Sequence, residues 1–185
     1  MNSKLSSDQI SGLVKRLRLG DESAFKQFFQ SFYPSIFHFI YRYLFDYEIA
    51  KDLSQDTFMK FWINRENIDP DLSPKTYLFR IARNLAINHI DRLPKITDLV
   101  GKEEILIQHC NNPEKDYELD FVINDFKKAV IYLPERCRVI FMLSRFHNFS
   151  YEEIAETLEI SLQTVKNQMN KAIAILRKSL QDHID

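Results

Sequence analysis

The residues with the most distinctive chemistry lie near the C-terminus, where residues 163–171 are rich in amides and lysines. Asparagine and glutamine can form paired hydrogen bonds with the edge of adenine, and lysine contacts guanine or neutralises phosphate. At about 100° per residue, one helix face carries Thr164, Asn167, Gln168 and Lys171, with Gln163, Lys166 and Asn170 at its flanks. The pattern favours a helix that reads DNA bases, and the alternative is an ordinary solvated helix face.

Two short helices separated by a turn are expected to present this face. Ser150 and Glu153 have the spacing of a capping box that begins the first helix. Glu159 lies in the turn where glycine is usual, at a cost of about 1 kcal/mol if its backbone is left-handed. Ser161 should cap the second helix, whose apolar stripe is Leu162, Val165, Met169, Ala172, Ile173 and Leu176. The spacing predicts a helix-turn-helix whose second helix enters a major groove.

A second group of cations and amides lies within residues 76–95. The apolar positions of this segment predict a helix whose inward face holds Leu78, Ile81, Ala82 and Leu85. The residues assigned to the outward face are Arg80, Arg83, Asn84 and Asn88. Such side chains suit phosphates and unpaired bases. Tyr77 and Phe79 could stack on bases, although aromatics at helical spacing more often belong to a core.

A third group of polar residues is acidic and lies on a helix that Asp46 is expected to cap. Asp52, Gln55 and Asp56 share the side of this helix away from its aromatic core, so they could meet basic residues of a protein partner. The alternative is a solvated acidic face.

Composition excludes several other classes of function. The chain of 185 residues has a net charge of −1 and only three glycines, so the glycine-rich loops of nucleotide-binding enzymes are excluded. Cys110 and Cys137 lack a CxxC partner and the five histidines lack ligand spacing, so we expect no metal and no cofactor. No segment has the length of a signal-peptide core or a membrane span, which predicts a cytoplasmic protein without membrane insertion.

The periodicity predicts an all-α fold of two small helical domains, 1–95 and 119–185, joined by an acidic linker, 96–118. In the first domain, Pro34 is expected to bend or restart a long helix, and Ser73 with Pro74 should begin the helix that ends before Pro94. In the second domain, a helix is expected over 120–133, before the one that starts at Pro134.

Three motifs together resemble a known family. "LPERCRVIFMLSRFHNFSYEEIAETLEISLQTVKNQMNKAIAIL" resembles the C-terminal domain of the extracytoplasmic-function (ECF) group of bacterial sigma-70 factors. "AKDLSQDTFMKFW" is similar to the Asp-Leu-x-Gln-Glu/Asp-x-Phe segment of that group, and "YLFRIARNLAINHI" is similar to its promoter-melting helix. The three motifs stand in the order and spacing of the family, from about Gly20 to Leu180.

The resemblance implies a specificity subunit of RNA polymerase that is not itself an enzyme. The N-terminal domain would dock on the β′ clamp helices of core polymerase and recognise the minus-ten promoter element. The C-terminal domain would recognise the minus-thirty-five element and touch the β flap, and an anti-sigma factor is the further partner implied. A stand-alone helix-turn-helix regulator of duplex DNA is the alternative, but it leaves Asp52, Gln55 and Asp56 without a role.

Overall fold

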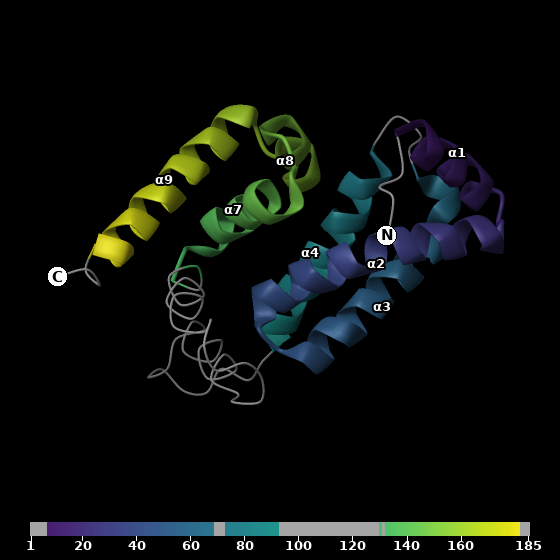
Figure 1. The fold of residues 1–185 in the computed structure, drawn as a ribbon, viewed down its shortest axis with the longest axis horizontal. Coiled ribbons are helices and arrows are strands. Elements are labelled where there is room, and N and C mark those ends of the chain that lie inside the picture. Colours follow the sequence, from purple (N-terminus) through teal and green to yellow (C-terminus); the bar gives the residue numbers. More distant parts are fainter. Residues whose placement is uncertain (1–6, 69–72, 93–129, 131, 182–185) are drawn as a thin grey trace. The chain divides into compact units, whose positions relative to one another are not determined.

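The computed structural model describes residues 7–68, 73–92, 130 and 132–181, and every regular element in these ranges is helical (Figure 1). The predicted all-α fold is therefore confirmed. The chain divides into two compact units, the first built on α1 to α4 and the second on α7 to α9. The predicted acidic linker lies outside the described residues, as does almost all of the helix expected over 120–133.

Among its described residues, the first unit contains four α-helices and one 3₁₀ turn. Their bounds are α1 Ser7–Arg18, α2 Glu22–Leu44, α3 Tyr47–Ile63, η1 Arg65–Asn67 and α4 Pro74–Arg92. Fully buried phenylalanines join α2 to its neighbours: the Phe28 and Phe61 rings stack with centroids 4.8 Å apart, and the Phe39 and Phe79 rings meet edge to face at 5.3 Å. Such aromatic pairs add to the stabilisation from burial alone. One aromatic core therefore fixes the relative positions of α2, α3 and α4.

Helix α2 does not restart at Pro34, which was one of the two outcomes expected from the sequence, because a single helix runs from Glu22 to Leu44. Proline removes one backbone hydrogen bond from a helix interior. The buried face of α2 offsets this loss, because it continues on both sides of the proline, with Phe28 before it and Ile36 and Phe39 after it. Packing therefore keeps the helix in one piece.

The sequence reasoning missed helix α1. Its buried residues Leu13, Val14 and Leu17 stand at helical spacing, and Leu17 is fully buried. This spacing was the available signal, although the segment is short and otherwise polar. Helix α1 belongs to the first unit and packs beside η1.

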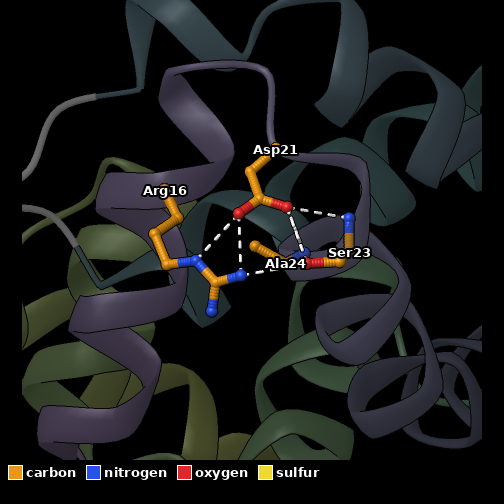
Figure 2. A network of polar contacts seen from close by, with 4 residues as sticks. All are labelled: Arg16, Asp21, Ser23 and Ala24. Atoms are coloured by element: carbon orange, nitrogen blue, oxygen red, sulfur yellow. Dashed lines mark hydrogen bonds and ion pairs between the residues drawn. The ribbon is translucent and has the colours of Figure 1, made fainter.

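The corner between α1 and α2 is closed by Asp21, which caps the N-terminus of α2 (Figure 2). Its Oδ1 accepts from the Ser23 N–H at 2.9 Å and the Ala24 N–H at 3.1 Å, and also from the Ser23 hydroxyl at 2.7 Å. Its Oδ2 accepts from Arg16 Nε at 2.8 Å. The Ser23 hydroxyl, the Ala24 N–H and the Arg16 guanidinium hold the pKa of Asp21 far below its ordinary value.

The second unit contains α7 Glu135–His147, α8 Tyr151–Leu158 and α9 Leu162–Gln181. Helix α9 packs on both of the others. The side chains at the centre of this unit are almost fully buried; they are Ile140, Met142, Ile154, Val165, Met169 and Ala172. A shared aliphatic core thus holds α9 in place and leaves its opposite face to solvent.

The turn between α8 and α9 follows the sequence-based expectation. Ser150 and Glu153 form the capping box: the Ser150 N–H donates to Glu153 Oε2 at 2.7 Å, and the Glu153 N–H donates to Ser150 Oγ at 3.1 Å. Glu159 ends α8 in the left-handed region, with φ 54°. Ser161 Oγ then accepts from the Thr164 N–H at 3.1 Å and so caps α9. These caps fix the start of α8, the end of α8 and the start of α9, and so define the helix-turn-helix.

Candidate nucleic-acid and protein interfaces

The polar face of α9 is largely open to solvent. Its exposed residues are Gln163, Lys166, Asn167, Asn170 and Lys171. Thr164 is half-buried, and its hydroxyl lies 2.8 Å from that of Ser161 at the cap. Gln163 Nε2 donates to Asn167 Oδ1 at 2.9 Å, so two amides are paired along the helix surface before any ligand binds. The face therefore offers hydrogen-bonding groups in a row that fits base edges.

The charge of α9 has one sign. The helix carries Lys166, Lys171, Arg177 and Lys178, all exposed, and no aspartate or glutamate. The nearby α8 residue Glu152 has a lowered pKa, chiefly because of its backbone N–H and the Ser150 hydroxyl, with a smaller contribution from Lys166. Cations on one side of a helix neutralise phosphates, and this binding is independent of base sequence.

Gln168 does not lie on the open polar face, and this corrects the sequence-based expectation. The Cys137 thiol of α7 donates to Gln168 Oε1, with Sγ and Oε1 3.0 Å apart. Cys137 is fully buried, and burial raises the pKa of its thiol. A long polar side chain at the edge of the apolar stripe can turn inward when a buried donor is in reach. Gln168 therefore links α9 to α7.

The predicted polar face of α4 is present, with two residues open and two half-covered. Asn84 and Asn88 are exposed, whereas Arg80 and Arg83 are half-buried. Arg83 Nη1 donates to Asn84 Oδ1 at 3.2 Å. The four positions share one side of the helix, so two guanidinium groups and two amides stand together. This set can contact phosphates and bases.

The two aromatic residues considered for base stacking on α4 have different environments. Phe79 is fully buried against Phe39, so the stacking alternative is wrong for Phe79. Tyr77 is half-buried, with its ring centroid 5.9 Å from that of Phe61. Its outer part stays open, and only this aromatic of the two can meet a base.

The acidic residues of α3 lie on its solvent side, opposite the buried Ser54, Phe58 and Phe61. Asp52, Gln55 and Asp56 are all exposed. The same side also carries two exposed apolar residues that sequence reasoning missed, Met59 and Ile63. Their spacing from Asp52 was the available signal, because positions 52, 55, 56, 59 and 63 share one helical face.

Other kinds of site find no support in the part of the chain that the structure describes. Within it, no group of three histidine, cysteine, aspartate or glutamate residues could hold a metal ion. No helix within the same ranges is long and apolar enough to cross a membrane.

Comparison with protein families gives two matches in chain order. The model of sigma-70 region 2 matches residues 28–94, which include α3, α4 and most of α2. The model of sigma-70 region 4 matches residues 123–176, which include α7, α8 and most of α9. Each candidate face therefore lies inside a matched region.

Individual proteins agree with the family matches. The chain is 27% identical to the ECF RNA polymerase sigma factor SigW of Bacillus subtilis, over 91% of this chain and 95% of that protein. It is 30% identical to the RNA polymerase sigma factor YlaC of the same organism, over 72% of this chain and 78% of that protein. Among solved structures, the sigma factor RpoE of Bartonella quintana, in complex with the anti-sigma factor NepR, has a TM-score of 0.65 and 26% identity, over 85% of this chain and 96% of that chain.

Proposed function

Because the chain belongs to the ECF group of the sigma-70 family of RNA polymerase sigma factors, we propose that it selects promoters through three helix faces of its own. Helices α9 and α4 bind promoter DNA, and α3 docks on core polymerase. The observation that carries this proposal is the face of α9, where exposed amides and lysines form a row without any carboxylate. The stand-alone regulator is not favoured, because it does not account for a sigma-70 region 2.

Helix α9 is the proposed reader of the minus-thirty-five element. Gln163, Thr164, Asn167 and Asn170 contact base edges, and Lys166 and Lys171 contact phosphate or guanine. The Gln163–Asn167 hydrogen bond supports this assignment, because it holds two amides in a defined orientation. Residues 119–185 form the proposed domain for this task.

Helix α4 is the proposed contact with the minus-ten element. Arg80 and Arg83 bind phosphates, and Asn84 and Asn88 contact bases that become unpaired. Binding of the exposed single strand supplies the free energy for melting, so the protein needs no catalytic residue of its own and the polymerase does the chemistry. Residues 1–95 form the proposed domain, and 96–118 the linker to the second one.

Helix α3 is the proposed contact with core polymerase. Asp52, Gln55 and Asp56 meet basic residues of the β′ clamp helices, and the second domain touches the β flap. The protein acts in the cytoplasm with the polymerase. We also propose an anti-sigma factor as a partner, and the complex of the similar Bartonella quintana protein with NepR supports this.

Run-off transcription tests the proposal. A pool of bacterial promoter fragments is transcribed by core polymerase alone and by core polymerase with this protein. We expect specific transcripts only when the protein is present, and their start sites give the promoter. A gel shift on the same pool without polymerase is the control, because tight binding there with no transcript would support a regulator of duplex DNA.

A further inference from the structure

The exposed side of α3 combines two kinds of side chain in one row. Asp52, Gln55 and Asp56 are followed on the same face by Met59 and Ile63, at the i, i+3, i+4, i+7 and i+11 positions of a helix. We call these five residues the α3 row. Its first part is acidic and amide-bearing, and its second part is apolar.

The apolar part of the row is unusually open to water. Met59 is 57% exposed and Ile63 is 64% exposed, although α3 has ample buried surface on its other side. Single exposed apolar residues are common on proteins, but two neighbours on one face beside charged residues indicate a surface that another molecule covers. Methionine is also enriched at protein interfaces.

The acidic part of the row is available for a partner as well. Within the part of the chain described, Asp52 and Asp56 make no ion pair, and the one ion pair on α3 joins Lys51 to Glu48 at 3.7 Å. Two carboxylates above two apolar side chains complement a surface with an apolar row flanked by lysine or arginine. Charge complementarity of this kind speeds association, whereas buried apolar contacts slow dissociation.

We propose that Met59 and Ile63 form the anchor of the polymerase contact, and that Asp52 and Asp56 steer the approach. The partner is a basic, apolar helical surface of core polymerase. This inference rests on the proposed function of α3, and it assigns different roles to the apolar and the acidic residues of that face. The two halves of one row thus control two different rate constants.

Association and dissociation rates of the full-length protein with immobilised core polymerase test the inference. The variants are Met59→Ala with Ile63→Ala, and Asp52→Asn with Asp56→Asn, each measured at several salt concentrations. The alanine pair should raise the dissociation rate by about 30-fold, from the lost apolar burial, and change the association rate by less than about twofold. The asparagine pair should lower the association rate by about tenfold at low salt and flatten its salt dependence.

Leu19→Ala is the matched control, because Leu19 is 88% exposed but lies in the turn after α1. It should leave both rates unchanged. A dissociation rate of the alanine pair within twofold of wild type, while the asparagine pair still binds weakly, would overturn the inference and leave the proposed function standing. Failure of the wild-type protein to bind polymerase would overturn both. A dimer of this chain that the alanine pair abolishes, with polymerase rates unchanged, would assign the face to a second copy and also overturn it.

Discussion

The outward faces of α3 and α9 are both exposed on a helix whose other side is buried, yet they are built from different chemistry. The face of α9 has cations and amides and no carboxylate. The α3 row has carboxylates, one amide and two apolar residues. A polyanion with patterned base edges requires the first set, and a folded protein with basic and apolar groups fits the second. Charge sign and apolar content, more than exposure, therefore distinguish a DNA face from a protein face.

Reversing the charge of the α3 row should have the largest effect. Asp52→Lys with Asp56→Lys should weaken polymerase binding by about 100-fold or more, because like charges then meet at the contact. Competition binding to core polymerase measures the loss. Glu22→Lys is the control, because Glu22 is exposed in the first turn of α2 and is not part of the row. Unchanged association of the α3 variant would remove the docking assignment.

Truncating two polar side chains of α9 should have the next largest effect. It should weaken promoter recognition and leave polymerase binding unchanged. Asn167→Ala with Lys171→Ala should lower transcription from promoters with a minus-thirty-five element by about 10-fold to 100-fold, through lost base and phosphate contacts. Run-off assays measure this, and polymerase binding should stay at the wild-type level. Lys26→Ala, an exposed cation of α2, is the control. A fall in polymerase binding would mean that the two faces had been confused.

The hydrogen bond between Cys137 and Gln168, which links α7 to α9, should make a smaller contribution, and it is a contribution to stability. Cys137→Val removes the thiol that donates to Gln168 while filling a similar volume. Loss of this hydrogen bond should lower the free energy of unfolding by about 1 kcal/mol. Chemical denaturation of the full chain measures it. If the variant and the wild type unfold at the same denaturant concentration, the inward position of Gln168 has no energetic role.

Replacing Asp21, at the corner between α1 and α2, should have the smallest effect. This effect is on stability, and it depends on pH. The pKa of Asp21 lies far below its ordinary value of 3.8, so its stabilising contribution is present above that value and is lost as pH falls below it. Asp21→Asn keeps a capping side chain but cannot titrate. The difference in melting temperature between the wild type and this variant should be constant above about pH 5 and shrink as the carboxylate protonates. A difference that grows on acidification would contradict the network at Arg16 and Ser23.

The sequence predicted the parts of the fold that depend on local chemistry. The capping box of Ser150 and Glu153 needs only residues three positions apart, and the left-handed Glu159 follows from the turn it occupies. The polar faces of α4 and α9 follow in the same way from helical spacing. All of these features are set by neighbours within one or two turns.

Features that depend on distant residues were harder to predict. Gln168 turns inward because Cys137, 31 positions away in the chain, offers a buried donor. Helix α2 passes through Pro34 because the aromatic core packs on both sides of it. Met59 and Ile63 were missed for a local reason: their spacing places them on the face of α3 opposite the buried Phe58 and Phe61, but their hydrophobicity alone suggests burial.

The most direct test of separate faces is a footprint of the polymerase complex on a promoter that the wild-type protein selects. The wild-type protein should protect both promoter elements. The variant with Asn167→Ala and Lys171→Ala should lose only the upstream protection. The variant with Asp52→Lys and Asp56→Lys should lose protection of both elements, because it no longer binds the polymerase. Upstream protection that persists in the α9 variant, or both elements protected in the α3 variant, would contradict the assignment of DNA to α9 and polymerase to α3.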